Sequence, residues 1–191
     1  MKALVTGANG FTGSHLVKLL VAQGNGVVGL VRRTSDLSRL ADVDVKLIYG
    51  DITDKDALNQ AMAAVDVVFH TAACVDLGIV DTARMERVNV EGTRTVLAAV
   101  KAQPTPPKLV YCSTIGIYGD TAGKVIDETY QRTQVGFSSA YDETKYNAQQ
   151  LVNQHVADGF AAVSVMPGGI FGADDPHFGP VIKLFKKGRL P

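Results

Sequence analysis

The segment VTGANGFTGSH, residues 5 to 15, places Gly7, Gly10 and Gly13 at every third position, directly behind an apolar run. Glycine has no Cβ atom, so another group can approach its backbone closely. A strand that leads through a glycine-rich turn into a helix also presents unpaired N–H groups and the positive end of the helix dipole. This segment therefore favours an α/β fold in which a phosphate group binds at the first strand-to-helix turn.

The three glycines have separate expected roles in such a turn. We expect Gly7 to make the tight turn, Gly10 to face a pyrophosphate, and Gly13 to let the helix pack against the sheet. The spacing G-x-x-G-x-x-G differs from the generic dinucleotide fingerprint G-x-G-x-x-G. A plain strand-to-helix turn is the alternative, and the strand and helix patterns on either side favour the dinucleotide site.

Apolar runs alternate with amphipathic stretches along the rest of the chain. The predicted strands are Lys2–Thr6, Gly26–Val31, Val45–Tyr49, Val67–His70, Lys108–Ser113 and Ala161–Met166. The predicted helices are Gly13–Gln23, Lys55–Ala64, Thr82–Gln103 and Ala140–Asp158. Continuous Val, Leu and Ile runs are typical of strands buried on both faces, and their alternation with helices indicates a parallel sheet between helical layers. We predict a Rossmann-type α/β fold with a doubly wound parallel sheet.

Charge and composition narrow the class of protein. The 191 residues suffice for one domain, and 19 basic side chains balance 19 acidic ones, so nothing favours a nucleic acid or an anionic membrane as partner. The first residues show no secretion signal, and no apolar run is long enough to span a membrane. Cys74 and Cys112 lack metal-ligand spacing, so we expect buried, reduced thiols, no metal site and a cytoplasmic protein. A homodimer is left open.

The end of the second predicted strand bears on the choice of cofactor. In dinucleotide sites an acidic residue here binds the 2′-hydroxyl of NAD, whereas an arginine accommodates the 2′-phosphate of NADP. The sequence GLVRRTSD has Arg32 and Arg33 and no acidic residue before Asp36. Two solvated loop arginines are the alternative, but a guanidinium group matches the geometry of a phosphate. We therefore favour NADP(H) as the cofactor, with NAD(H) still open.

A tyrosine and a lysine indicate the chemistry. In SSAYDETKYNAQQLV, Tyr141 and Lys145 lie four residues apart at the start of a predicted helix, on one face. A nearby ammonium group stabilises a phenolate and lowers the phenol pKa from about 10. Tyr141 could then exchange a proton with a carbonyl or alcohol oxygen. The pattern alone is a weak signal because a surface pair has the same spacing, and the neighbouring Tyr146 has Gln150 in place of a lysine.

These motifs together resemble the extended short-chain dehydrogenases/reductases, in the branch of epimerases, dehydratases and dihydroflavonol-reductase-like enzymes. Seven segments match the family's motifs in the family's order: TGANGFTG, YGDITD, VVFHTAA, RVNVEGT, VYCSTIGIYG, YDETK and VMPGGIFG. The resemblance implies an NAD(P)-dependent oxidoreductase or epimerase that acts on a small-molecule substrate. Besides Arg32 and Arg33, it implies cofactor contacts from Gly7, Asn9, Gly10, Phe11, Thr12, Gly13, Asp51, Ile52, Thr71, Ala72, Ala73, Asn89, Ser113, Tyr141, Lys145, Pro167, Gly168, Gly169 and Ile170.

The resemblance also implies roles for individual side chains. Thr114 aligns with the family's catalytic hydroxyl, which would hydrogen-bond to the substrate oxygen, and Ser113 is the adjacent alternative. Lys145 would also hydrogen-bond to the nicotinamide ribose. The expected catalytic set is Thr114, Tyr141 and Lys145. His70 ends a predicted buried strand beside the cofactor loop, so we expect a hydrogen-bonded structural histidine rather than a catalytic one.

Departures from the family narrow the function. Sugar-nucleotide dehydratases carry an acidic pair directly after the catalytic threonine, where this chain has Ile115 and Gly116, so dehydration is not expected. The leading interpretation is an NADP(H)-dependent oxidoreductase that transfers a hydride to or from a carbonyl or secondary alcohol through the threonine, tyrosine and lysine. The alternatives are a nucleotide-sugar epimerase with tightly bound NAD and a non-catalytic dinucleotide sensor.

The expected domain boundaries follow from the same resemblance. Residues 1–191 would form the NAD(P)-binding Rossmann domain. Residues 167–191 would begin a truncated substrate-binding part, with the family's small C-terminal substrate domain largely absent. Substrate specificity would then come from residues 76–82, from residues 115–139 and from the absent C-terminal segment.

Overall fold

A parallel sheet forms the centre of the molecule. The computed structural model describes residues 1–75, 81–176 and 178–189, so residues 76–80 of the expected specificity segment lie outside the described residues. The strands are β1 (Lys2–Thr6), β2 (Gly26–Val31), β3 (Lys46–Tyr49), β4 (Val67–His70), β5 (Lys108–Cys112) and β6 (Ala162–Val165). They form one sheet in the order β3-β2-β1-β4-β5-β6. This order is the one of dinucleotide-binding Rossmann folds, so the predicted fold class is confirmed.

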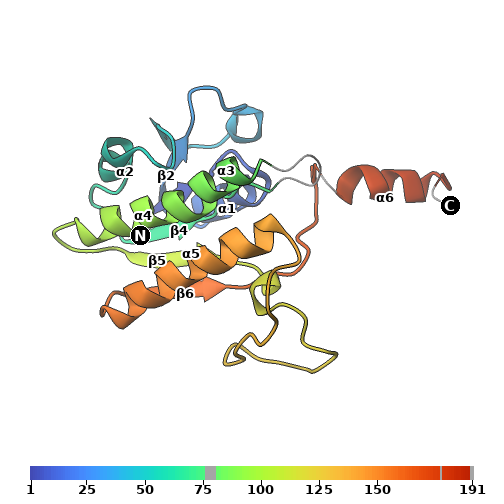
Figure 1. Ribbon diagram of the computed structural model, residues 1–191. Helices are drawn as coiled ribbons and strands as arrows, with labels where there is room; N and C mark the ends of the chain where they lie inside the picture. Colours follow the sequence, from blue (N-terminus) through green and yellow to red (C-terminus); the bar gives the residue numbers. More distant parts are fainter. Residues whose placement is uncertain (76–80, 177, 190–191) are drawn as a thin grey trace.

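The strand order reverses beside β1. β1 pairs in parallel with β2 on one side and with β4 on the other, and Thr6 lies opposite His70 where β1 and β4 end. From β1 the chain continues into a helix on one face of the sheet, and from β4 it continues to the other face (Figure 1). The two loops therefore diverge and leave a crevice. Ligands of open α/β sheets bind at this point, outside the carboxyl ends of the strands.

Helices cover both faces of the sheet. They are α1 (Phe11–Ala22), α2 (Lys55–Ala61), α3 (Thr82–Met85), α4 (Gly92–Lys101), α5 (Ala140–Ala157) and α6 (Phe178–Lys186). Leu58 of α2, Val96 of α4 and Val152 of α5 are buried in one apolar core with the sheet. Val17 and Leu20 of α1 are buried in a second core on the opposite face. The sheet is thus the middle of three layers (Figure 1).

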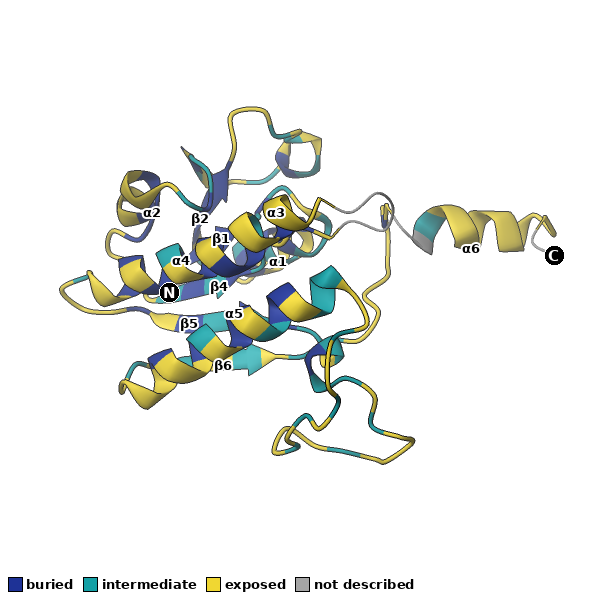
Figure 2. Cartoon of the chain, viewed as in Figure 1, coloured by how far each residue is buried: buried dark blue, intermediate teal, exposed yellow. Residues whose placement is uncertain are grey.

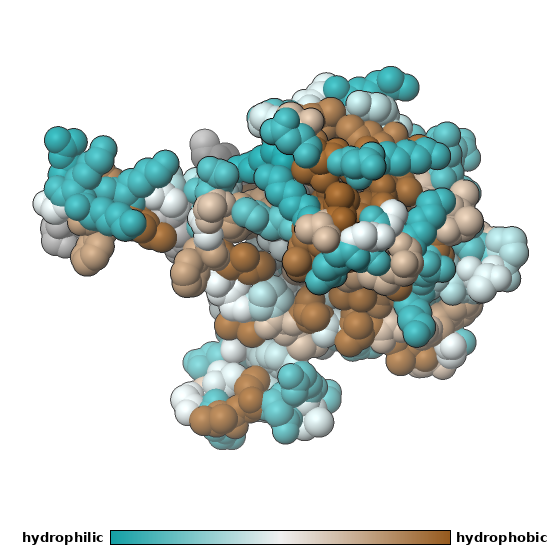
Figure 3. Space-filling model, turned by 180° about the vertical axis from the view of Figure 1, so that it is seen from behind, coloured by the Kyte–Doolittle hydropathy of each residue, from teal (hydrophilic) through white to brown (hydrophobic). Residues whose placement is uncertain are grey.

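Apolar surface remains beside β6. On the sheet face that α1 packs against, Val163 and Val165 are 56% and 47% exposed. Figure 3 shows hydrophobic side chains gathered on this side of the molecule. α6 extends away from the sheet, and Figure 2 shows that most of it is exposed. Among the described residues, none of the helices combines the length and apolar character needed to cross a bilayer.

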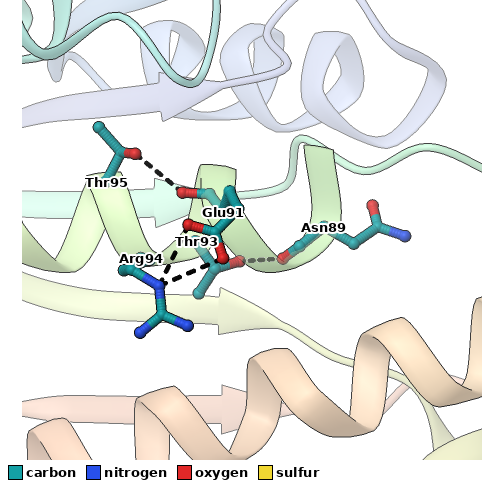
Figure 4. A network of polar contacts seen from close by, with 5 residues as sticks. All are labelled: Asn89, Glu91, Thr93, Arg94 and Thr95. Atoms are coloured by element: carbon teal, nitrogen blue, oxygen red, sulfur yellow. Dashed lines mark hydrogen bonds and ion pairs between the residues drawn. The ribbon is translucent and has the colours of Figure 1, made fainter. Parts of the chain in front are cut away.

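The stretch predicted as one helix, Thr82–Gln103, has three parts in the structure. A π-helical turn, η2 (Glu86–Glu91), separates α3 from α4. The hydroxyl of Thr93 donates a 2.6 Å hydrogen bond to the carbonyl oxygen of Asn89 (Figure 4). Threonine hydroxyls that bond to the carbonyl four residues back compete with the backbone ladder and bend helices. We attribute the irregular turn around Asn89 to this competition.

Candidate active site

Two of the three glycines in the glycine-rich turn are closely packed, and the third is exposed. Gly7 has a φ of +68°, and a Cβ atom there would lie 2.8 Å from the Cα atom of Ala72. A Cβ atom on Gly13 would lie 2.1 Å from the carbonyl oxygen of Gly7. Gly10 is exposed and precedes α1 with extended backbone angles. Gly7 and Gly13 therefore serve the turn and the packing of α1, while Gly10 leaves bare backbone at the start of the helix.

The start of α1 offers backbone donors to an anion. The first intrahelical hydrogen bond runs from the N–H of Ser14 to the carbonyl oxygen of Gly10 over 2.9 Å. The N–H groups of Phe11, Thr12 and Gly13 precede it and have no acceptor within the helix. Because α1 is 12 residues long, the positive end of its dipole adds to the attraction for a phosphate.

A cavity of about 220 Å³ lies at the carboxyl ends of β1 to β4. It brings together residues from four of the predicted cofactor segments: Gly7, Asn9, Gly10, Arg32, Asp51, Ile52, Thr71, Ala72 and Ala73. Its other lining residues are not in the predicted set: Leu30, Val31, Gly50, Cys74, Arg84 and Val88. Val31 and Gly50 lie at strand ends, and this position could have indicated that they line the cavity. Arg84 and Val88 lie four residues apart on one helical face, which alone does not indicate a ligand.

The two arginines after β2 lie in different surroundings. Arg32 lines the cavity, and within the described ranges its guanidinium group has no hydrogen bond or ion pair. The guanidinium carbon of Arg33 lies 5.8 Å from the centroid of the Tyr49 ring, and Arg33 is not part of the cavity lining. Arg32 is therefore the member of the pair that faces the cavity.

His70 occupies the middle of a buried chain of hydrogen bonds. Its Nδ1 lies 2.8 Å from the hydroxyl of Thr6, and its Nε2 lies 3.0 Å from the hydroxyl of Thr93. Because Thr93 donates to the carbonyl oxygen of Asn89, its own oxygen accepts from Nε2–H, which leaves Nδ1 to accept from Thr6. Burial, and secondarily the charge of Lys145, lowers the pKa of His70 to about 3. The expectation of a buried, hydrogen-bonded histidine is confirmed.

Asn89 is buried and connects two segments that frame the crevice. Its Oδ1 accepts from the N–H of Cys74 over 2.8 Å, and its Nδ2 donates to the carbonyl oxygen of Cys74 over 3.1 Å. Nδ2 also lies 3.0 Å from the hydroxyl of Thr144, which stands on α5 between Tyr141 and Lys145. Asn89 is not part of the cavity lining. Through these hydrogen bonds Asn89 links the loop after β4 to the start of α5.

Tyr141 and Lys145 lie in the first turns of α5, beside the end of β5. Lys145 is 2% exposed, and its Nζ donates a 2.7 Å hydrogen bond to the carbonyl oxygen of Cys112. The same atom lies 4.3 Å from the centroid of the Tyr111 ring. Burial lowers the pKa of Lys145 to about 8. The protein thus holds this ammonium group at the carboxyl end of β5.

The pKa of Tyr141 moves in the opposite direction from the one expected from the sequence. Burial, with smaller contributions from Cys112 and Asp142, raises this pKa to about 12. The ammonium group of Lys145 does not offset the burial, because it is directed to the carbonyl oxygen of Cys112. At neutral pH Tyr141 is therefore a protonated phenol, which is the form of a general acid.

The hydroxyl groups of Thr114 and Ser113, which follow β5, differ in their hydrogen bonding. The Oγ1 of Thr114 accepts a 3.2 Å hydrogen bond from the N–H of Gly116, at the start of a 3-10 turn, η3 (Ile115–Tyr118). Ser113 is 3% exposed, and its hydroxyl has no partner among the residues described. Buried hydroxyls are nearly always hydrogen-bonded, so this group has an unused bonding capacity. In the same described part of the chain no hydrogen bond joins Thr114 to Tyr141.

The loop after β6 borders the same corner. The N–H of Ile115 donates a 3.1 Å hydrogen bond to the carbonyl oxygen of Pro167. A Cβ atom on Gly168 would lie 3.5 Å from the side chain of Ile115, while one on Gly169 would meet open space. Ile170 is 40% exposed. The predicted segment 167–170 therefore lies beside the residues that follow Thr114.

A sequence model described as the NAD dependent epimerase/dehydratase family matches residues 3–187. The chain belongs to this family. It is 36% identical over 181 residues to the 4-hydroxy-2-methyl-3-oxo-4-farnesyl-3,4-dihydroquinoline-1-oxide ketoreductase of Stigmatella aurantiaca, over 94% of this chain and 53% of that protein. It is 34% identical to a 3-beta-hydroxysteroid dehydrogenase of Mycolicibacterium neoaurum, over 91% of this chain and 49% of that protein.

The solved structure of an epimerase has the same fold. The UDP-glucose 4-epimerase of Thermus thermophilus, in complex with NAD, superposes with a TM-score of 0.80 at 30% identity. The match covers 93% of this chain and 58% of the epimerase. The chain spans about half the length of the curated relatives it matches.

The residues of this epimerase/dehydratase family member fit a nicotinamide dinucleotide. Gly10 leaves the start of α1 uncovered, where a side chain would stand between a phosphate and the helix N–H groups. Arg32 presents a guanidinium group without a protein partner in the described part of the chain. Ser113 keeps a buried hydroxyl without a partner among the described residues. Each of these groups lacks a partner that a bound dinucleotide or substrate would supply.

Proposed function

We propose that the chain is the NADP(H)-binding part of an oxidoreductase that interconverts a carbonyl compound and a secondary alcohol. The observation that carries the proposal is the arrangement of Tyr141 and the buried Lys145 one turn apart at the start of α5, beside the end of β5. The likeness to a ketoreductase and to a hydroxysteroid dehydrogenase supports the same reaction class. The substrate is a small molecule with a carbonyl or hydroxyl group.

The cavity-lining residues and the start of α1 would hold the cofactor. The bare backbone at Gly10 and the helix N–H groups would bind the pyrophosphate, and Arg32 would bind the 2′-phosphate. Asp51 and Ile52 would flank the adenine ring. Thr71, Ala72 and Ala73 would line the phosphate and ribose side of the cofactor. Further predicted contacts would lie along the nicotinamide half: Ser113, Tyr141, Lys145, Pro167, Gly168, Gly169 and Ile170.

The protein side of the reaction is a proton transfer. The bound cofactor supplies or accepts the hydride at the substrate carbon. In the reductive direction the Tyr141 hydroxyl donates its proton to the substrate oxygen, so that carbonyl carbon and oxygen each gain one hydrogen and become a secondary alcohol. The hydroxyl of Thr114, with Ser113 as the adjacent alternative, would donate a hydrogen bond to that oxygen and stabilise its developing charge.

The protonated state of Tyr141 is the one that a proton donor in carbonyl reduction has, and a tyrosine with the ordinary pKa of about 10 shares it at neutral pH. The Tyr141 pKa of about 12 keeps the proton in place at neutral pH, as a proton donor requires. Oxidation of an alcohol would need the phenolate, which Lys145 would have to stabilise after moving from the carbonyl oxygen of Cys112 to the ribose and the phenol.

A nucleotide-sugar epimerase is the second candidate. It is favoured by the likeness to the NAD-bound UDP-glucose 4-epimerase of Thermus thermophilus. Epimerisation would oxidise and re-reduce one carbon without releasing the cofactor, so the purified protein would retain NAD. Arg32 at the end of β2 argues for a 2′-phosphate instead. A dinucleotide sensor without catalysis would not need the tyrosine and lysine pair.

We assign residues 1–191 to the dinucleotide-binding domain, with 167–191 as the beginning of a substrate-binding part. The exposed valines of β6 and the exposed apolar side chains of α6 offer surface against which such a part could pack.

The test compares two tyrosines on one helix. Tyr141→Phe removes the proposed acid, whereas Tyr146→Phe changes a tyrosine whose ring packs 5.4 Å from that of Phe137. Both variants and the parent protein are assayed with NADPH against ketones, aldehydes and nucleotide sugars. We expect Tyr141→Phe to lose about 10²–10⁴-fold in turnover while it retains NADPH affinity, and Tyr146→Phe to resemble the parent. Equal turnover in Tyr141→Phe and the parent contradicts the mechanism.

A further inference from the structure

The guanidinium group of Arg84 has no hydrogen-bond or ion-pair partner in the described part of the chain. Several other arginines do have partners there: Arg39 with the carbonyl oxygen of Asp174, Arg87 with Asp51, Arg94 with Glu91 and Arg132 with the carbonyl oxygen of Gln134. Arg84 shares its unpartnered state with Arg32, and both line the same cavity. Two arginines whose guanidinium groups have no hydrogen-bond or ion-pair partner among the described residues thus line one cavity.

The backbone holds Arg84 at the mouth of the crevice. Its N–H donates a 2.9 Å hydrogen bond to the carboxylate of Asp81, which caps α3. Arg84 and Val88 are four residues apart on one helical face, and both line the cavity. α3, which carries Arg84, begins beyond the carboxyl ends of the strands (Figure 1), and Val88 follows in η2.

The position of Arg84 relative to the strand order distinguishes it from Arg32. Arg32 follows β2, where the ribose 2′-oxygen of a dinucleotide lies. Arg84 belongs to the connection after β4, and Gly10 to the turn after β1. These two connections flank the point where the strand order reverses, and the pyrophosphate lies there on the start of α1. Arg84 and Gly10 therefore stand on the two connections that flank this point, whereas Arg32 stands on the connection after β2.

The acidic residue of the cavity lining does not neutralise these arginines. Asp51 is the carboxylate in the lining formed by described residues. Its Oδ1 accepts from the N–H and the hydroxyl of Thr53 over 3.2 and 2.9 Å, and lies 3.9 Å from the guanidinium group of Arg87. Arg87 is not part of the lining, so Asp51 is compensated from outside the cavity. Arg32 and Arg84 leave the cavity with a positive excess.

We propose that Arg84 is a second phosphate-binding arginine, which binds the cofactor's pyrophosphate from the side opposite the α1 N-terminus. This inference rests on the proposed NADP(H)-binding function. Arg84 supplies affinity shared by NADPH and NADH, whereas Arg32 supplies the preference for the 2′-phosphate. The planar guanidinium fork can bond two phosphate oxygens at once, which a lysine at the same position cannot do.

The experiment measures dissociation constants by calorimetry for NADPH, NADH, ADP and adenosine. The variants are Arg84→Ala, Arg84→Lys, Arg32→Ala and the surface control Arg94→Ala, and thermal unfolding checks that each remains folded. We expect Arg84→Ala to weaken NADPH, NADH and ADP by about tenfold or more, with the NADPH-to-NADH ratio and adenosine binding unchanged. Arg84→Lys should recover part of the loss, and Arg94→Ala should resemble the parent.

Two results overturn the assignment while leaving the proposed function intact. The first is that the parent binds NADPH and Arg84→Ala binds every ligand as tightly as the parent does. The second is that Arg84→Ala loses affinity for NADPH alone, which would mean that Arg84 contacts the 2′-phosphate. Failure of the parent chain to bind either dinucleotide overturns the proposed function together with this inference. A loss in Arg84→Ala that disappears in high salt, as expected for a charge contact, supports the assignment.

Discussion

The Nζ atom of Lys145 lies 2.7 Å from the carbonyl oxygen of Cys112, the last residue of β5. This bond fastens α5 to the end of a strand, and it occupies the ammonium group that the proposed chemistry needs at the ribose. The aromatic face of Tyr111 lies beneath it at 4.3 Å. Lys145 is thus placed by the folded chain, with a carbonyl oxygen and a ring as neighbours instead of a carboxylate.

Lys145→Met should impair both cofactor binding and turnover. Methionine fills similar volume but donates no hydrogen bond, so the carbonyl of Cys112 loses its partner and the ribose loses its proposed contact. We expect NADPH affinity to fall about tenfold or more, since a hydrogen bond to a charged group is worth about 1.5–3 kcal/mol. Tyr141→Phe is the matched variant that should retain affinity. Wild-type affinity in Lys145→Met, measured by calorimetry, contradicts the proposed role.

Gly10 and Gly13 should respond differently to substitution. Gly13→Ala places a methyl group 2.1 Å from the carbonyl oxygen of Gly7, so we expect a loss of about 1–3 kcal/mol in the free energy of unfolding. Gly10→Val places its side chain at the exposed start of α1, with its Cβ atom 3.1 Å from the carbonyl oxygen of Gly7, and should remove dinucleotide binding with a smaller cost in stability. Urea unfolding and NADPH titration separate the two effects. Unchanged NADPH affinity in Gly10→Val would refute the phosphate site.

Arg32 and Arg33 form a matched pair for the cofactor preference. Arg32→Ala should weaken NADPH by about tenfold or more and leave NADH nearly unchanged, because it removes one charge-assisted contact to the 2′-phosphate. Arg33→Ala should have little effect, since Arg33 lies over Tyr49 outside the cavity. Dissociation constants for both nucleotides in both variants check this. A larger effect of Arg33→Ala than of Arg32→Ala would reverse the assignment.

His70 should make the fold sensitive to mild acid. Its pKa is lowered from 6.5 to about 3 by burial, so the unfolded chain binds a proton that the folded chain does not between these values. The free energy of unfolding should therefore fall as the pH decreases through 6.5 toward 3. His70→Gln should show a shallower decrease between pH 6.5 and about 4.5 than the parent. Equal slopes for the parent and His70→Gln would show that another group causes the decrease.

The strands were predictable because their signal is local. Runs of Val, Leu and Ile ended by glycine or polar residues give every strand within one residue at each end, and β1, β2 and β4 have the predicted bounds. The stretch Thr82–Gln103 was less predictable, because the hydroxyl of Thr93 competes for a backbone carbonyl and makes part of it a π-helical turn. The periodicity of apolar residues carries no information about this hydrogen bond from a side chain to the backbone.

The backbone segments of the site were predictable from the glycines and the family motifs. Which side chains line the cavity was less predictable, because that depends on the direction in which each side chain points. The sequence treats Arg32 and Arg33 alike, but alternation along the chain sends one to the cavity and the other to Tyr49. Arg84 belongs to no motif and enters the cavity because the chain crosses to the other face after β4. The raised pKa of Tyr141 depends on burial and on where Lys145 bonds, neither of which the spacing of four residues contains.

The most direct test of the account is a calorimetric titration of the 191-residue chain with NADPH and with NADH under identical salt and pH. The glycine turn, the start of α1 and Arg32 together predict one binding site and a lower dissociation constant for NADPH than for NADH. Absence of binding by both nucleotides, or a lower dissociation constant for NADH, would contradict the central claim that this cavity is an NADP(H) site.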